Sequence, residues 1–219
     1  MRKSYFFRIP MLIWGLFLYS LGAVVIINAQ IGYAPWDVFH AGFSKVTGAS
    51  IGTVCIVTGI TVGVLVFLLG EKLGLGTIAN MVLIGSFLDM IIALRIVPIT
   101  VSLLMSIIML TIGLIIMALA TYFYINAGFG AGPRDSLMVA LTRMTHLPIG
   151  VCRGGIEVLV VFIGWRLGGM VGIGTLISAM TIGLWIQTVF RLFRFDATKI
   201  KHETLNDTYR NIFVRKYTD

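Results

Sequence analysis

The sequence predicts an all-α membrane protein with six transmembrane helices, arranged as two inverted three-helix repeats that each carry a short extra half-helix. Three observations support this fold class. The 219 residues are 58% hydrophobic and only 12% charged, whereas soluble domains are roughly 25% charged. Six apolar segments are long enough to cross a bilayer, and the chain repeats itself at an offset of 98 residues.

The first apolar segment, 9–27, follows a basic start, as a secretory signal would. The apolar core of such a signal is roughly 7–15 residues long and is followed by a small-residue cleavage site. Segment 9–27 is longer and has no clean site of this kind. We therefore expect it to be the first membrane span.

Five further segments are predicted to span, because crossing a bilayer takes about 20 mostly apolar helical residues. They are 51–69, 75–94, 101–125, 149–167 and 173–193. Two more segments, 32–47 and 130–145, are too short to cross. The residues from 196 to 219 are polar and mixed in charge, so we expect a basic tail that at most touches anionic lipid headgroups.

Lysine and arginine are distributed unequally between the two sides of these spans, which orients the chain. If the N-terminus is cytoplasmic, the inner segments hold 14 of the 17 basic residues, and only Lys45, Arg95 and Arg166 lie outside. We therefore expect a multi-pass protein of the plasma membrane with both termini in the cytoplasm. Cys55 and Cys152 then lie near helix starts on opposite membrane faces, so no disulfide is expected.

The offset of 98 residues aligns the chain with itself without a gap. Between positions 15 and 90 it pairs 20 identical residues out of 76, and seven of these pairs are glycines. Pairs of Asn, Pro, Asp and Gly carry most information, because backbone geometry and polarity constrain these residues. The chain thus divides into a first repeat, 1–98, a second repeat, 99–195, and the tail. Since each repeat crosses the membrane three times, the second is predicted to be inverted.

Each repeat carries one motif directly after its first span, NAQIGYAPWD or NAGFGAGPRD. Its glycine permits a positive φ angle, its proline suits the first turn of a helix, and its aspartate can accept first-turn N–H groups. Each motif is therefore predicted to begin a short helix. The candidate substrate-binding residues are Asn28, Gly32, Pro35 and Asp37 in the first motif and Asn126, Gly130, Pro133, Arg134 and Asp135 in the second.

Two interpretations of these motifs remain open. Trp36, Phe39, Phe43 and Val46 form one apolar face of the first short helix, which suits a helix lying on the membrane interface or one re-entering the protein. In the first case the aspartates only cap surface helices. In the second, both helix N-termini meet at the pseudo-twofold axis and form a site for an anion or a polar substrate.

Few other polar residues lie within the spans. Arg153 and Glu157 are four residues apart, so they share a helix face and are expected to pair, either as a structural clamp or along a solute pathway. Asp89 is close enough to Arg95 for an interfacial pair, and its repeat counterpart is Gln187. We expect a structural role for Asp89 and Gln187, with a solute pathway as the alternative.

The remaining patterns argue against several functions. His40 and His146 are unmatched between the repeats and are expected to be solvated side chains. The runs GLGTI and GIGTL follow no predicted strand, so they are not dinucleotide loops. No cluster of nucleophile, base or metal ligands occurs, so neither an enzyme nor a metal or cofactor site is expected. The formal charge of +8 comes largely from span ends and the tail, which argues against a nucleic-acid partner.

The motif GYAPWD and the run GSFLD, from Gly85 to Asp89, resemble those of the YczE/YyaS/YitT family of bacterial membrane proteins. The likeness covers almost all of residues 10–195. It is closer to YczE-like members, because the soluble C-terminal domain of YitT-like members is absent from the sequence. The resemblance implies an integral protein of the bacterial plasma membrane and implies little about its activity.

Two functions are compatible with these features. A small transporter or channel for an unidentified polar or ionic solute would use the paired motifs as its site. The alternative is a non-transporting accessory protein that supports a biosynthetic or transport system. Besides the lipid bilayer and the solute, a homodimer partner is compatible with the glycine-bearing helix faces, which serve internal packing equally well.

Overall fold

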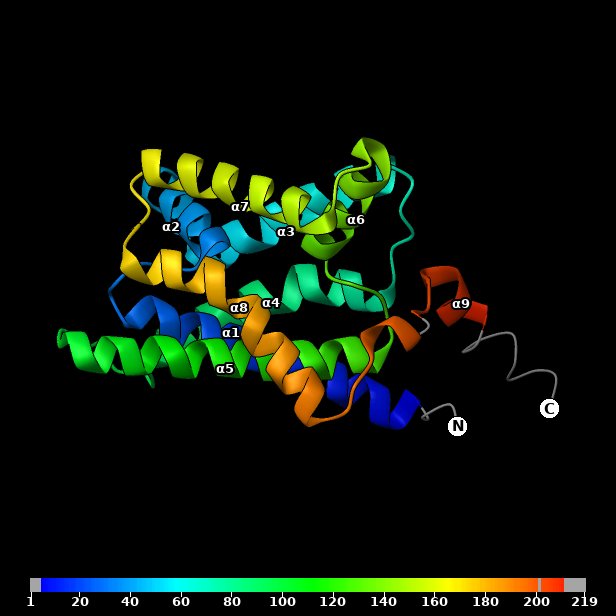
Figure 1. Cartoon of the computed structure of the whole chain (residues 1–219), viewed down its shortest axis with the longest axis horizontal. Helices are drawn as coiled ribbons and strands as arrows, with labels where there is room; N and C mark the ends of the chain where they lie inside the picture. Colours follow the sequence, from blue (N-terminus) through cyan, green and yellow to red (C-terminus); the bar gives the residue numbers. More distant parts are fainter. Residues whose placement is uncertain (1–4, 201, 211–219) are drawn as a thin grey trace.

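A computed structural model describes residues 5–200 and 202–210 of the chain (Figure 1). These residues form helices and no strand. The predicted spans are α1 (Tyr5–Asn28), α3 (Ile51–Leu68), α4 (Leu75–Leu94), α5 (Leu103–Ala127), α7 (Ile149–Arg166) and α8 (Ile173–Leu192). The short segments form α2 (Pro35–Thr47) and α6 (Pro133–Thr145), and the tail holds a 3-10 turn (Ala197–Lys199) and α9 (Leu205–Tyr209).

The prediction of a helical membrane protein is confirmed. Five helices, α1, α3, α4, α5 and α8, are each long and apolar enough to cross a bilayer. Helix α7 carries more charge, and it qualifies only together with α6, from which it is bent by 119°. The described residues therefore hold five candidate spans, or six if α6 and α7 count as one broken span.

Helices α1 and α5 form the centre of the bundle, where they run antiparallel side by side (Figure 1). Glycines bring their backbones together. A Cβ atom at Gly22 would lie 2.8 Å from the carbonyl oxygen of Gly113, and one at Gly15 would lie 2.8 Å from the amide nitrogen of Tyr124. Because close backbone approach drives helix association in lipid, this pair of helices anchors the remaining spans.

The helix bounds and contacts recur along the chain. Helices α2, α3 and α4 begin and end 98 positions before α6, α7 and α8. Helix α2 packs on α7 as α6 packs on α3, and α1 packs on α4 as α5 packs on α8. One contact has no counterpart, because α3 packs along α4 whereas α7 makes no extended contact with α8. Helices α7 and α8 diverge toward the end of the molecule that carries both termini (Figure 1).

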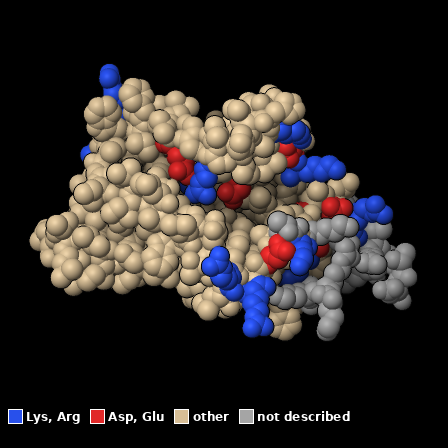
Figure 2. All heavy atoms as spheres, viewed as in Figure 1, with Lys and Arg blue, Asp and Glu red and all other residues tan. Residues whose placement is uncertain are grey.

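The outside of the bundle is apolar. Large hydrophobic side chains on α3, α5, α7 and α8 are more than half exposed, among them Phe67, Leu104, Val158 and Leu184. In Figure 2 most of the visible face is tan, and most of the blue atoms lie toward the end that carries the tail. Such a surface suits a lipid bilayer. The chain is therefore a membrane-embedded helical protein.

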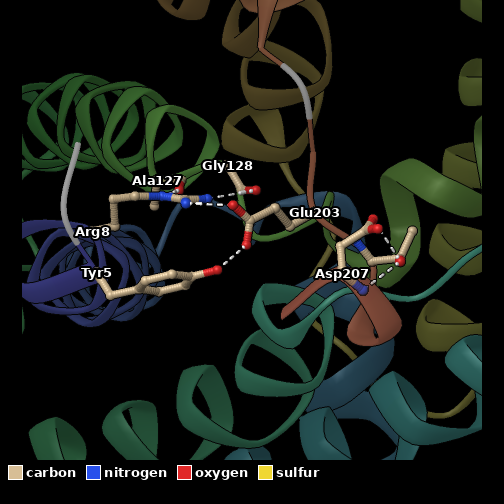
Figure 3. A network of polar contacts seen from close by, with 7 residues as sticks. Tyr5, Arg8, Ala127, Gly128, Glu203 and Asp207 are labelled. Carbon is tan, nitrogen blue, oxygen red and sulfur yellow. Dashed lines mark hydrogen bonds and ion pairs between the residues drawn. The ribbon is translucent and has the colours of Figure 1, made fainter. Parts of the chain in front are cut away.

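The tail docks on the bundle, which corrects the prediction of a segment that touches only lipid. Glu203 accepts hydrogen bonds from Nη1 of Arg8 at 2.6 Å and from the hydroxyl of Tyr5 at 2.7 Å (Figure 3). Arg8 also donates to the carbonyl oxygens of Ala127 and Gly128. An ion pair between residues 195 positions apart leaves no local sequence pattern. Within the predicted tail, residues 201 and 211–219 lie outside the described residues.

Glu203→Gln is expected to loosen this docking. The amides of Glu203 and Leu205 donate to the carbonyl oxygens of Gly128 and Leu73, so their hydrogen exchange reports whether the segment is docked. A hydrogen bond to a charged partner contributes about 1.5–3 kcal/mol. We therefore expect exchange at both amides to accelerate by about tenfold or more.

Asp207→Asn is the matched control for this measurement. Within residues 5–200 and 202–210, its carboxylate hydrogen-bonds to Thr204 at the start of α9 and to no other residue, so exchange at the Glu203 amide should stay at the wild-type rate. If Glu203→Gln also leaves that rate unchanged, the ion pair with Arg8 does not hold the tail.

Candidate functional site

A sharp turn precedes each of the short helices α2 and α6, and glycine makes both turns possible. We call these turns the two helix breaks. Gly32 has a φ angle of +115° and Gly130 one of +112°, a conformation that side-chain-bearing residues rarely adopt. The amide of Gly174, in the first turn of α8, donates to the carbonyl oxygen of Ile31 at 2.7 Å. An equivalent bond of the same length joins the first turn of α4 to the second break. The N-termini of α8 and α4 therefore fix the two breaks.

Gly130→Ala is expected to destabilise the fold by about 1–3 kcal/mol, the cost of forcing a side chain into a disfavoured backbone region. The added Cβ would also lie 2.8 Å from Oγ1 of Thr77. Gly150→Ala is the control, because the added Cβ atom would have no described atom from another part of the chain within 4 Å and a helical Gly→Ala change should be neutral or stabilising. Thermal unfolding in detergent measures both, and equal midpoints would contradict a strained break.

The inward face of α2 differs from the predicted apolar face. Phe39 and Phe43 are half-buried and Val46 is 64% exposed, whereas Asp37 and His40 are buried. In lipid an aromatic face can lie outside while the polar residues turn inward. Helix α2 therefore packs between α7 and α3 with its polar residues toward the interior.

The first turns of α2 and α6 meet inside the bundle. The guanidinium carbon of Arg134 lies 4.5 Å from the centre of the Trp36 ring, and its Nη2 lies 3.2 Å from Nε2 of His40. Nη2 also lies 3.7 Å from Sγ of Cys55 on α3. Trp36 and Arg134 hold equivalent positions in the two motifs. The two motifs thus lie side by side.

The two motif aspartates have different surroundings. Asp135 accepts a hydrogen bond from the hydroxyl of Tyr124 at 3.1 Å and lies beside Gly132. Asp37 accepts no first-turn N–H group, so the predicted cap is absent from α2. Its Oδ1 lies 3.4 Å from Nδ1 of His40, without hydrogen-bond geometry. Among the described residues, this long contact with His40 is the one polar side-chain contact of the Asp37 carboxylate, although Asp37 is only 6% exposed.

Tyr19 of α1 completes this group. It lies within electrostatic range of Arg134, Asp37 and Asp135. Its hydroxyl forms no hydrogen bond with any other described residue. We refer to the following six residues as the central polar cluster: Tyr19, Trp36, Asp37, His40, Arg134 and Asp135.

Sequence reasoning missed four residues at this site, of which Trp36 had been assigned only to the apolar face of α2. The expectation that His40 is solvated is wrong, because its ring is fully buried where α2 turns its polar face inward. Its position three residues after Asp37, on the same helix face, was the one available signal. Tyr19 and Cys55 lie in uniformly apolar spans, where nothing in the sequence separates them from lipid-facing residues.

Arg153 and Glu157 border the central polar cluster. They pair on α7 at 2.8 Å, as their spacing predicts, and Arg153 lies within electrostatic range of Asp135. The Arg153 side chain is 36% exposed and that of Glu157 is 13% exposed. Figure 2 shows acidic and basic side chains in a hollow below α7, on an otherwise apolar face. The hollow between α7 and α8 therefore leads toward the central polar cluster.

Several predicted residues lie elsewhere. The Asn28 amide donates to the carbonyl oxygen of Val97 at 2.8 Å, and that of Asn126 lies 3.9 Å from the sulfur of Met11. Both asparagines thus contact neighbouring chain segments instead of the charged residues. The motif prolines begin α2 and α6, and Gln187 is exposed on α8.

Asp89 has a structural role at the start of α3. It accepts hydrogen bonds from the amide of Gly52 at 2.8 Å and from the hydroxyl of Ser50. The predicted pair with Arg95 is wrong, because the carboxylate is occupied by this helix terminus and the described residues include no such ion pair.

The central polar cluster is suited to binding a polar ligand. No carboxylate in the described part of the chain lies within ion-pairing distance of Arg134. Arg134, Asp37 and Tyr19 therefore keep polar atoms available for another group. Since unsatisfied polar atoms are costly in a low-dielectric interior, we expect water or a solute to contact them. Residues 5–200 and 202–210 contain no group of three or more His, Cys, Asp and Glu side chains that could hold a metal ion.

Comparison with known proteins gives relatives whose activity is not stated. A family described as "Family of unknown function (DUF6198)" matches residues 6–191. A Bacillus subtilis protein named "Uncharacterized membrane protein YczE" is 33% identical over 175 residues, which cover 79% of this chain and 80% of that protein. A Haemophilus influenzae "Uncharacterized protein" is 34% identical over 179 residues, covering 82% of this chain and 81% of its own.

A further Bacillus subtilis relative, "Uncharacterized protein YyaS", is 27% identical over 177 residues and covers 79% of this chain and 87% of its own. The predicted resemblance to YczE and YyaS is confirmed. No solved structure gives a significant match to the chain.

Proposed function

Because the chain belongs to the DUF6198 family, whose relatives include a membrane protein, we propose that it is a cell-membrane transporter that moves a small polar or ionic solute through the central polar cluster. One observation carries the proposal. The N-termini of α2 and α6 meet around the partly buried Arg134 and the buried Asp37, which contact the two ring nitrogens of His40 and form no ion pair with each other. Half-helices that end inside the membrane form the substrate sites of many transporters.

An inverted repeat of residues 1–98 and 99–195 is the second part of the proposal. The equivalent helices α1 and α5 run antiparallel, which supports inversion. The recurrence of helix bounds at 98 positions supports the same division. The axis would pass between α1 and α5 and through the contact between Trp36 and Arg134.

An asymmetry between the halves supports an alternating-access mechanism. A Cβ at Gly52 would clash with the carbonyl oxygen of Gly85, so α3 and α4 touch backbone to backbone. A Cβ atom at the equivalent Gly150 or Gly183 would have no described atom from another part of the chain within 4 Å. If the halves exchange these arrangements, α7 closes on α8 while α3 separates from α4. The cluster would then open alternately to the two membrane faces.

In the proposed orientation, the separated helices α7 and α8 open toward the cytoplasmic face. Gly150 starts α7 on the side of the molecule that carries both termini, and Gly52 starts α3 on the opposite side. The excess of lysine and arginine near the termini supports a cytoplasmic location for that side. The structure would then correspond to an inward-open state.

Uptake into liposomes tests this function. Purified protein is reconstituted, and the entry of four radiolabelled solutes is followed: alanine, propionate, ethylamine and glycerol. We expect at least one solute to enter faster than into protein-free vesicles, with saturation at high concentration. Entry rates equal to those of protein-free vesicles for all four solutes would contradict transport of small polar solutes.

A further inference from the structure

The unpaired charges of the central polar cluster indicate the class of solute. Arg134 supplies a positive charge that no described carboxylate pairs with. Asp37 supplies a negative charge that is 6% exposed and pairs with no described lysine or arginine. Two opposite charges are thus available at one site.

His40 separates these two charges without cancelling either. Its Nε2 lies 3.2 Å from Nη2 of Arg134, and its Nδ1 lies 3.4 Å from Oδ1 of Asp37. A guanidinium group can only donate hydrogen bonds, so Nε2 accepts and the proton of the neutral ring is on Nδ1. The neutral His40 ring therefore lies between the Arg134 guanidinium and the Asp37 carboxylate.

The neighbouring charged groups are already engaged. Asp135 accepts from Tyr124 and lies within electrostatic range of Arg153, and Arg153 pairs with Glu157. A solute with only a negative charge would bind Arg134 but lie close to the carboxylate of Asp37. A solute with only a positive charge would lie close to the guanidinium of Arg134. Both repulsions are strong in a low-dielectric interior.

We infer that the solute is a small zwitterion, whose anionic group binds Arg134 and whose ammonium group binds Asp37. The inference rests on the transporter function proposed above. The free hydroxyl of Tyr19 can bind either end, and the Trp36 ring can face a cationic group. Two sources carry this chemistry: a free amino-acid-like solute, and the headgroup of a zwitterionic phospholipid entering from the bilayer through the hollow between α7 and α8.

Ligand-induced thermal stabilisation of the purified protein tests the class. Three matched sets are compared, built on alanine, leucine and phenylalanine, each with the acid that lacks the amine and the amine that lacks the acid. We expect at least one amino acid to raise the unfolding midpoint by about 5 °C at saturation, and its acid and amine counterparts to raise it far less. The lipid headgroup is tested by comparing zwitterionic short-chain phosphatidylethanolamine with anionic short-chain phosphatidylglycerol. If phosphatidylethanolamine stabilises the protein and no amino acid does, the ligand is a lipid headgroup.

Charge variants make the assignment specific. Asp37→Asn should transfer the stabilisation from the zwitterion to the matched acid, and Arg134→Gln should transfer it to the matched amine. A variant that does not fold is replaced by Asp37→Glu or Arg134→Lys, which should keep the zwitterion preference with a smaller shift.

The failures of the two proposals are distinguishable. The zwitterion inference is wrong if the wild type is stabilised by acids alone, by amines alone, or by none of the amino acids and lipids. Saturable uptake of any solute would still support the transporter function. Stabilisation by a zwitterion without any uptake into liposomes overturns transport and leaves a zwitterion-binding membrane protein.

Discussion

Arg134→Gln is expected to reduce saturable solute uptake by about 10- to 100-fold, which corresponds to the roughly 1.5–3 kcal/mol of a hydrogen bond to a charged group. The side chain lies on the Trp36 ring and against His40, at the meeting point of α2 and α6. Glutamine keeps a donor there and removes the charge. Initial uptake rates of the solute that the wild type transports measure the effect.

Folding should survive this substitution, which separates a functional role from a structural one. Arg134 has no carboxylate partner among the described residues, so its replacement leaves no buried carboxylate without an ion-pair partner. Arg143→Gln, on the same helix, is the matched control. Arg143 pairs with Glu71 at 2.9 Å with its side chain 53% exposed, and such pairs contribute at most about 1 kcal/mol. Loss of uptake in both variants, or in neither, would refute a specific role for Arg134.

A disulfide between Gly150→Cys and Gly183→Cys is expected to abolish uptake. At neither position would a Cβ atom come within 4 Å of a described atom on another helix, whereas a disulfide requires Cβ atoms about 3.5–4.5 Å apart. The bond can therefore form only if α7 closes on α8. In a background without Cys55 and Cys152, we expect oxidation to cross-link the pair in membranes, uptake to fall to that of protein-free vesicles, and reduction to restore it.

The two single-cysteine variants are the controls for this experiment. Because the equivalent residues Gly52 and Gly85 touch backbone to backbone, an added side chain can itself hinder closure, so uptake by the cross-linked pair is compared with that of each single variant and of the reduced pair. If the pair never cross-links in membranes while the denatured protein does, α7 and α8 do not close. Full uptake by the cross-linked protein would show that closure is not part of a transport cycle.

The spans could be predicted from the sequence because hydropathy and helix-breaking residues determine them directly. The predicted segment 75–94 coincides with α4, and predicted starts at 51, 149 and 173 coincide with α3, α7 and α8. Proline at the first helical position likewise gave the starts of α2 and α6. Glycine and proline restrict the backbone locally, so their effects are visible without tertiary information.

The arrangement of polar side chains could be predicted only in part. Arg153 and Glu157 pair through helix periodicity, which is a local rule. His40 was expected to be solvated because it has no counterpart in the second repeat, whereas α2 turns its apolar face outward and buries His40. In lipid that face can point outward, and the sequence does not state which helix covers the other face.

Long-range partners were beyond sequence reasoning for the same physical reason. Tyr19 reaches the central polar cluster from α1 only because Gly15 and Gly22 bring α1 and α5 together. The pair of Arg8 and Glu203 depends on where the tail returns to the bundle. No periodicity within one segment encodes either contact.

The accessibility of native Cys55 tests the central claim most directly, because this thiol lies beside Arg134 and needs no change to the site. Protein with Cys152→Ala is reconstituted, and a membrane-impermeant thiol reagent is added to one face at a time, with and without the transported solute. The account predicts labelling of Cys55 from each face, slowed by bound solute, since the central polar cluster would open to both sides in turn. If Cys55 reacts from neither face, or from one face only under every solute gradient, although it labels fully after denaturation, the cluster is a sealed structural core and the alternating-access account is wrong.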